Sequence, residues 1–178
     1  ATIYFGGGTP STFPVECIAR LVDALKKYKY WQTPVEATIE VNPGTADLEK
    51  LKALRALGFD RISFGVQSLN DSELKTIGRI HSAREALQAI AWAKEAGFTR
   101  ISADLIYGLP GQTLTSLRKT LEELTATGIE HVSVYGLIVE ESPPLYTLIN
   151  EGKLSLPDED TAADMYEFVQ NFLKEQGF

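Results

Sequence analysis

Short apolar runs alternate along the chain with longer stretches in which apolar residues recur at helical spacing. The short runs are rich in β-branched and aromatic residues, a pattern typical of buried strands. Five strands are predicted in this way, at Thr2–Phe5, Glu36–Val41, Arg61–Val66, Arg100–Tyr107 and His131–Leu137. The repeated order of strand and then helix indicates parallel β-α units and therefore an α/β fold.

The helical stretches carry start and stop signals. Pro14 stands in the first turn of a helix predicted to run to about Tyr28, because proline suits that position. Thr45 is expected to cap the next helix, and Gly58 is expected to end it.

Two further helix starts have the spacing of a capping box. In this motif the side-chain oxygen of the first residue accepts the backbone amide of an acidic residue three positions later, and the acidic side chain accepts the backbone amide of the first residue. The pairs are Asn70 with Glu73 and Ser82 with Glu85. Gly97 and Gly128 are expected to end the next two helices. Pro143-Pro144 precede a short helix that Gly152 ends, and Asp158 is expected to start a last helix that runs to about Gln176.

The strand count predicts part of a (β/α) barrel of the TIM type. A complete eightfold barrel typically needs ~250 residues, whereas this chain has 178 residues. The chain enters a strand directly after Ala1 and stops at Phe178, where another strand is expected, so we expect further sequence on both sides of one domain, residues 1–178. The alternative is a doubly wound sheet, although its Gly-x-Gly-x-x-Gly signature does not follow the first strand.

The composition and net charge of the chain exclude several classes of function. A hydrophobic content of 44% can bury a core, and 24 acidic against 17 basic residues leave a net charge of -7. Nonspecific nucleic-acid or anionic-membrane binders normally carry the opposite charge. The sequence has no apolar run long enough for a membrane helix and no signal-peptide pattern at its start, so we expect a cytoplasmic protein. The single cysteine, Cys17, cannot form an internal disulfide or a metal site by itself.

Ligands of parallel barrels bind at the carboxyl ends of the strands, and unusual residues follow four of the five strands there. The first strand runs into Gly6-Gly7-Gly8-Thr9-Pro10, where the absence of side chains would let a ligand touch the backbone. A flexible turn is the alternative. Alternation along the second strand places Glu40 on the inner face, where it needs a cation or several donors. That cation is either a ligand ammonium or a structural arginine.

Three more side chains complete the candidate site. Gln67 and Asp104 could bond vicinal hydroxyls such as those of a ribose, or belong to an internal polar network. Arg79 could grip a carboxylate, or face solvent. His81 and His131 are interpreted as structural. The set suits a zwitterionic amino acid joined to a ribose.

These ordered motifs resemble the radical S-adenosylmethionine proteins, specifically the oxygen-independent coproporphyrinogen III oxidase group. The resemblance covers nearly the whole chain. It rests on residues 6–10, Glu40-Val41-Asn42-Pro43-Gly44, Gly65-Val66-Gln67-Ser68, Arg79 and residues 104–113. Three segments resemble the heme-chaperone branch of the group more than the oxidases, namely residues 42–45, 78–82 and 156–166.

The resemblance implies a cofactor and residue roles. Gly7, Gly8 and Thr9 would line the methionine end of S-adenosylmethionine, and Glu40 and Arg79 would hold its amino and carboxylate groups. The same resemblance gives Gln67 and Asp104 the ribose hydroxyls and sets the backbone near Ile138 beside the adenine.

One departure limits the activity implied by the resemblance. The family's Cys-x-x-x-Cys-x-x-Cys motif, which ligates a [4Fe-4S] cluster, is not among these residues, so this chain alone is expected to be inactive. For the full-length protein the resemblance implies the cluster and heme as a further ligand, with heme delivered to an accepting protein. The alternatives are decarboxylation of coproporphyrinogen III to protoporphyrinogen IX, and a barrel that binds a small nucleotide or phosphate without radical chemistry.

Overall fold

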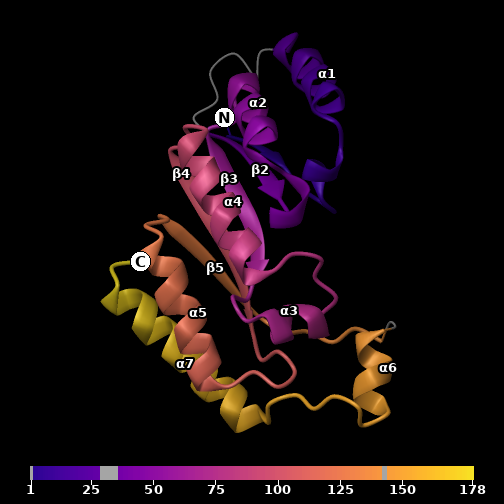
Figure 1. Cartoon of the computed structure of the whole chain (residues 1–178), viewed down its shortest axis with the longest axis vertical. Helices are drawn as coiled ribbons and strands as arrows, with labels where there is room; N and C mark the ends of the chain where they lie inside the picture. The colour runs from indigo at the N-terminus through magenta and orange to yellow at the C-terminus, as the bar shows by residue number, and fades with distance from the viewer. Residues whose placement is uncertain (1, 29–35, 142–143) are drawn as a thin grey trace.

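The computed structural model describes residues 2–28, 36–141 and 144–178. Five parallel strands form one twisted sheet with helices packed along it (Figure 1). The strands are β1 Thr2–Phe5, β2 Glu36–Val41, β3 Arg61–Gln67, β4 Arg100–Tyr107 and β5 His131–Gly136. All five predicted strands are therefore confirmed, with β3 one residue longer and β5 one residue shorter than expected.

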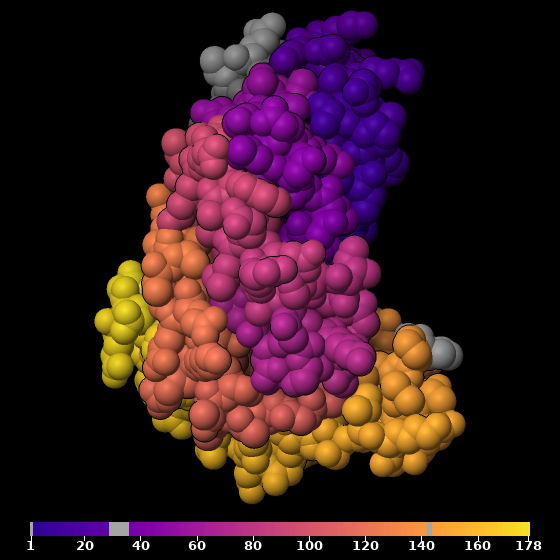
Figure 2. Space-filling view, in the orientation of Figure 1, coloured from indigo at the N-terminus to yellow at the C-terminus, as the bar shows by residue number. Residues whose placement is uncertain are grey.

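The strands lie in the sheet in the order in which they occur in the chain, β1-β2-β3-β4-β5. A doubly wound sheet reverses its strand order at a switch point, so that alternative is excluded. The sequential order is that of a partial (β/α) barrel, as predicted. The space-filling view shows the same progression along the long axis, from the amino-terminal units at one end to α7 at the other (Figure 2).

Seven α-helices connect and follow the strands in the described part of the chain. They are α1 Val15–Lys26, α2 Leu48–Leu57, α3 Asp71–Thr76, α4 Ala83–Glu95, α5 Leu114–Ala126, α6 Leu145–Asn150 and α7 Glu159–Glu175. Gly58, Gly97, Gly128 and Gly152 follow helix ends with positive φ, as predicted. Asp158 caps α7, and Ser82 with Glu85 forms the predicted capping box of α4. Pro143 lies outside the described residues.

Two predicted helix starts are wrong in detail. Asp47, and not Thr45, caps α2 by accepting the Lys50 amide at 2.8 Å. Thr45 instead ends the short 3-10 turn Pro43–Thr45 that precedes α2, where its hydroxyl donates to the Asn42 carbonyl at 2.7 Å. Asn70 caps α3, but Glu73 does not return to the Asn70 amide. That amide donates to Ser68 Oγ at 3.0 Å instead, which leaves Glu73 free for other donors.

Alternation along the strands separates an apolar face from a polar face. Ile39, Ile62 and Ile101 are paired in register across β2, β3 and β4, and all three are buried in the core under the helices. The residues next to them in sequence point the other way, so Glu40 pairs with Ser63 across β2 and β3. The inner face of the sheet is consequently polar, and this face leads to the carboxyl ends of the strands.

Candidate functional site

A cavity of about 160 Å³ opens at the carboxyl ends of β1 to β4, and we call it the strand-end cavity. Its lining comes from the loop after β1, from three strands and from the segment after α3. The lining residues are Gly8, Thr9, Glu40, Val41, Asn42, Ser63, Gly65, Gln67, Arg79 and Asp104. Six of the eight residues predicted to bind a cofactor thus converge on one cavity, although they are spread over nearly 100 positions of the sequence.

The three consecutive glycines meet different structural needs. Gly7 and Gly8 have φ values of 83° and 73°, in the left-handed region that favours glycine. Gly6 is required for space, because a Cβ at this position would lie 2.5 Å from the Tyr4 ring and 2.8 Å from the Glu40 carboxyl carbon. The loop is therefore more than a flexible turn, since its geometry brings the backbone against Glu40.

Glu40 is held by two donors from β1 and the loop that follows. The Tyr4 hydroxyl donates to Oε1 at 2.6 Å, and the Gly7 amide donates to Oε2 at 3.1 Å. Among the described residues, no lysine or arginine forms an ion pair with this carboxylate, so the predicted alternative of a structural arginine is wrong. Partial burial, together with the bond to Glu40, raises the pKa of Tyr4.

Tyr4 was not among the residues predicted to form the site. The alternation of β1 could have placed it on the inner face, but its partner Glu40 lies 36 positions further along the chain. Only the parallel pairing of β1 with β2 brings the two side chains together.

Asp104 lines the cavity from β4 and lies next to Ser63 of β3. The Ser63 hydroxyl is 3.4 Å from each Asp104 carboxylate oxygen. Burial raises the pKa of Asp104, while hydrogen bonds from Ser133 and Ser63 act in the opposite direction and the nearby Glu40 charge adds to the rise. Among the described residues, no lysine or arginine forms an ion pair with the Asp104 carboxylate.

Gln67 has an unusual backbone conformation, with a φ of 66°, at a shift in the pairing of β3 with β4. Among the described residues it is the one non-glycine residue with positive φ. A Cβ added at Gly65 would lie 3.0 Å from the Gln67 amide nitrogen and 3.9 Å from the Arg79 guanidinium, so both side chains lie over Gly65. Two of the predicted site residues are thereby brought together, although they were assigned to different parts of the ligand.

Arg79 is half-buried and lines the cavity, which rules out the solvent-facing alternative. Burial lowers the pKa of its guanidinium, and the negative charge of Asp104 opposes this shift. Within the described residues, no ion pair occupies the Arg79 side chain. A cation that is partly desolvated and not paired is available to an anionic group of a ligand.

The two other predicted cofactor residues lie apart from the lining. Gly7 does not line the cavity, but its amide donates a hydrogen bond to Glu40, which does. Ile138 follows β5 and is 83% exposed, so the structure does not bring its side chain to the cavity. His81 is buried between Asn42 and the Val66 carbonyl, in agreement with a structural role, and His131 is 2.8 Å from Ser102 Oγ.

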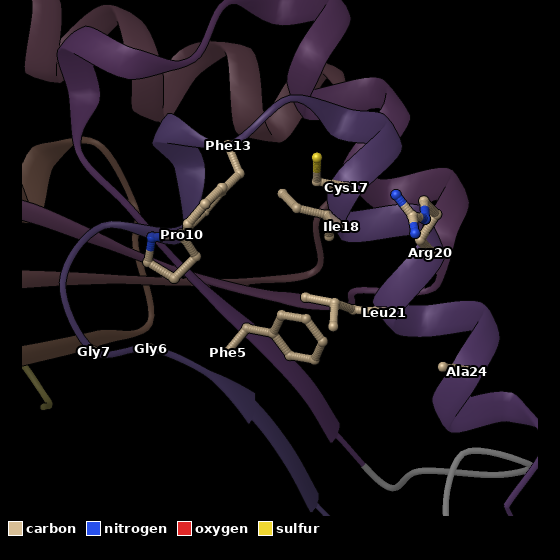
Figure 3. Close-up of a pocket in the computed structure, with 10 residues that line it drawn as sticks. All are labelled: Phe5, Gly6, Gly7, Pro10, Phe13, Cys17, Ile18, Arg20, Leu21 and Ala24. Carbon is tan, nitrogen blue, oxygen red and sulfur yellow. The ribbon is translucent and has the colours of Figure 1, made fainter.

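A larger groove of about 590 Å³ lies between β1 and α1 (Figure 3). Its lining is mainly apolar, with Phe5, Phe13, Ile18 and Leu21 facing it and the charged Arg20 beside them. It lacks the convergent polar groups of the strand-end cavity, which are what fix the orientation of a bound small molecule.

The polar groups of the strand-end cavity fit S-adenosylmethionine. Glu40 and Asp104 supply two negative charges, Arg79 supplies one positive charge, and Gln67 supplies an amide with both a donor and an acceptor. Such a set can hold an ammonium, a carboxylate and hydroxyl groups. At about 160 Å³ the cavity is smaller than the ~300–1,000 Å³ typical of small-molecule pockets, so a ligand of this size would extend along the strand ends.

The same residues do not fit an iron-sulfur cluster. The chain has one cysteine, and Cys17 is exposed. No group of three metal-ligating side chains occurs within the described residues. A [4Fe-4S] cluster is held by several cysteine thiolates, so this chain does not supply its ligands.

Comparison with known proteins gives a family match and extended similarity. The family model described as "Radical SAM superfamily" matches residues 1–124. The heme chaperone HemW of Bacillus subtilis is 39% identical over 177 residues, which cover 99% of this chain and 47% of that protein. The mitochondrial radical S-adenosyl methionine domain-containing protein 1 of Bos taurus is also 39% identical, over 99% of this chain and 40% of its own length. The chain thus spans less than half the length of these relatives.

A solved structure shows the same fold. The coproporphyrinogen III oxidase HemN of Escherichia coli, described as a radical SAM enzyme, superposes with a TM-score of 0.84 at 31% identity, over 99% of this chain and 40% of that chain. The predicted partial barrel therefore agrees with both the sheet topology and a solved neighbour. Among the described residues, no helix has the length and apolar character needed to cross a membrane.

Proposed function

The chain belongs to the radical SAM superfamily, and from this premise we propose that it is the S-adenosylmethionine-binding core of a heme chaperone similar to HemW. The observation that carries the proposal is the convergence of six predicted residues, from four strand ends and the segment after α3, on the strand-end cavity. Ligands of parallel β/α barrels bind at this end of the strands.

The proposed contacts follow from charge and position. Glu40 takes the ammonium of the methionine part, because Tyr4 and Gly7 fix its carboxylate and leave lone pairs open. Arg79 takes the carboxylate, and Gln67 and Asp104 take the ribose hydroxyls. Gly7, Gly8 and Thr9 approach the methionine end through their backbone, and the adenine extends past the cavity toward the backbone near Ile138.

When bound, S-adenosylmethionine supplies a carbon-sulfur bond that one electron from an iron-sulfur cluster can cleave. The part of this chain is to bind and orient the cofactor, since the cluster needs ligands that the chain does not contain. Heme binding, and delivery of heme to an accepting protein, belong to the proposal for the whole protein. This part of the proposal is supported by three relatives named heme chaperone HemW, which are 37% to 39% identical to this chain.

Oxygen-independent coproporphyrinogen III oxidation is the second candidate. The structural similarity to HemN of Escherichia coli favours it. The two candidates share the cofactor and differ in what binds next, which is heme for a chaperone and a porphyrinogen for an oxidase. A cytoplasmic location is part of the proposal, and cell fractionation tests it, because some relatives carry mitochondrial names.

The test starts from the longest natural form of the protein, reconstituted anaerobically with iron and sulfide. We expect about four irons per chain, micromolar binding of S-adenosylmethionine in calorimetry, and heme binding without turnover of coproporphyrinogen III. Formation of protoporphyrinogen IX would select the oxidase instead. A folded protein that binds neither S-adenosylmethionine nor heme would refute both candidates and leave a nucleotide-binding barrel.

A matched pair of variants ties the binding to the cavity. Arg79→Gln removes the guanidinium that lines the cavity, and the loss of a charge-assisted pair is expected to weaken S-adenosylmethionine binding about tenfold or more. Arg84→Gln removes an exposed arginine of α4 that does not line the cavity and should leave the affinity unchanged. Equal affinities for the two variants would contradict the assigned contact.

A further inference from the structure

Glu73 is a buried carboxylate outside the lining of the strand-end cavity. It is 3% exposed, and within the described residues it forms no ion pair. A buried charge is costly unless several donors meet it. Its donors are Ser68 Oγ at 2.6 Å, Ser116 Oγ at 2.6 Å, Gln112 Nε2 at 3.1 Å and Asn70 Nδ2 at 3.4 Å.

These donors come from segments that leave two neighbouring strands. Ser68 directly follows β3, and Asn70 caps α3. Gln112 lies in the loop after β4, and Ser116 is in the first turn of α5. One carboxylate thus joins the loop after β3 to the loop after β4, which both lie at the carboxyl end of the sheet.

The bond to Gln112 continues into the backbone of the loop after β4. Gln112 is 4% exposed, and its side-chain oxygen accepts the Gly108 amide at 2.7 Å and the Leu109 amide at 3.3 Å. Gln112 belongs to the motif of residues 104–113, in which the sequence pattern assigned no role to the glutamine. Its bonds to the two backbone amides explain why a glutamine occupies this position. The loop that follows Tyr107 is therefore fixed by the same network.

On the β3 side, the network adjoins the strained residue of the cavity. The Ser68 amide donates to the Val66 carbonyl at 2.9 Å, which closes a three-residue turn with Gln67 at its centre. A turn of this kind with positive φ is rare and strained, and it persists only where the surroundings hold it. Ser68 is held by Glu73, and His81 Nε2 donates to the same Val66 carbonyl at 3.2 Å.

We propose that Glu73 is a positioning residue, which holds the strained turn at Gln67 and thereby aims the Gln67 amide into the strand-end cavity. The proposal rests on the proposed function, because its main measurement is S-adenosylmethionine binding. Glu73 does not touch the ligand. It fixes Ser68, and Ser68 in turn fixes the conformation of the preceding residue, Gln67.

The first measurement compares two glutamates at the same helix position. Glu73 and Glu85 both occupy the third position of a helix, α3 and α4, but Glu85 is exposed and bonds Ser82. In the longest natural form of the protein, Glu73→Gln is expected to weaken S-adenosylmethionine binding about tenfold, the size of a typical coupling between contacting groups. Glu85→Gln should leave the affinity unchanged. If Glu73→Gln does not fold, Ser68→Ala replaces it, because it removes one donor only.

A double-mutant cycle separates positioning from a general structural role. Gln67→Gly removes the amide and also relieves the strain, because glycine adopts positive φ freely. If Glu73 acts through Gln67, Glu73→Gln should change the affinity less than about twofold in the Gln67→Gly background. A loss of about tenfold in both backgrounds would overturn the proposal. A wild-type protein that does not bind S-adenosylmethionine overturns the proposed function instead.

Hydrogen exchange tests the network without any ligand. The amides of Gly108 and Asn70 are bonded to members of the network, so Glu73→Gln should speed their exchange while the exchange of the α4 amides stays unchanged. Unchanged exchange at Gly108 and Asn70 would show that Glu73 does not hold the loops and would overturn the proposal.

Discussion

At the scale of single residues, the loop after β1 shows how one residue type serves two needs. Gly7 and Gly8 supply positive φ, which valine cannot adopt without strain. A Gly8→Val variant would therefore disturb the backbone whether or not a ligand lies nearby. Gly6 has no such conformation but lies against Tyr4 and Glu40. Substitution of Gly6 is consequently the cleaner test of the site.

Gly6→Ala should displace the Glu40 carboxylate, because the added Cβ would lie 2.8 Å from its carbon. We expect S-adenosylmethionine binding in calorimetry to weaken about tenfold, as for a lost hydrogen bond to a charged group. Gly44→Ala is the control, since its Cβ would meet His81 and Ile80 at an ordinary 3.5 Å. Wild-type affinity in Gly6→Ala would show that the position of Glu40 does not matter for binding.

Single residues also show where prediction from sequence ends. The inward direction of Glu40 follows from the period of two in a strand, so it was predictable. The positive φ of Gln67 was not, because it depends on bonds from Glu73 and His81, which no local pattern encodes. Tyr4 was missed for a similar reason, since its partner is fixed by strand pairing and not by spacing.

At the scale of elements, the strands were predicted to within one residue because their apolar runs are bounded by polar loops. Helix starts were harder. Ser82 caps α4 as expected, since its hydroxyl accepts the Glu85 amide at 3.2 Å while it donates to the Glu85 carboxylate at 2.7 Å. Thr45 does not cap α2, because it ends the 3-10 turn Pro43–Thr45, where its hydroxyl bonds the Asn42 carbonyl and Ser11, and the next acidic residue, Asp47, takes the role. Capping is thus a competition between neighbours that tertiary contacts decide.

The corrected cap is testable by stability. Asp47→Ala removes the acceptor of the Lys50 amide and should lower the free energy of unfolding in urea by about 1 kcal/mol, the usual cost of a lost N-cap. Asp23→Ala is the control, because Asp23 is exposed inside α1 and alanine favours helix there. Equal stability of the wild type and Asp47→Ala would mean that α2 does not depend on this cap.

At the scale of the whole molecule, the two ends of the sheet carry different kinds of polar residues. At the amino ends, the Glu36 carboxylate lies 3.1 Å from Arg100, and Asp60 accepts the Ala37 amide at 2.6 Å. Charges and donors match there, as a structural network requires. At the carboxyl ends, Glu40 and Asp104 have hydroxyl and amide donors, but among the described residues neither carboxylate forms an ion pair with a lysine or arginine. In β/α barrels the carboxyl ends carry the chemistry and the amino ends carry stability.

This division predicts opposite effects for two aspartate substitutions. Asp60→Ala leaves the Ala37 amide without its acceptor and should lower the free energy of unfolding by about 1–3 kcal/mol, with S-adenosylmethionine affinity unchanged. Asp104→Asn should weaken that affinity about tenfold or more while the fold stays intact, because a charged acceptor for the ribose is lost. A loss of both properties in both variants would contradict the division.

The pH dependence of stability checks the second half of this prediction. Burial raises the pKa of Asp104 in the folded state, so the folded protein binds its proton more tightly than the unfolded chain does. Stability then falls as pH rises from the unfolded pKa through the folded pKa, and the full penalty is present above the folded pKa. Asp104→Asn removes this penalty, so we expect it to unfold at higher urea than the wild type at neutral pH and to lose that advantage below the unfolded aspartate pKa. If Asp104→Asn is more stable than the wild type and also binds S-adenosylmethionine more weakly, the Asp104 charge serves ligand binding and not stability.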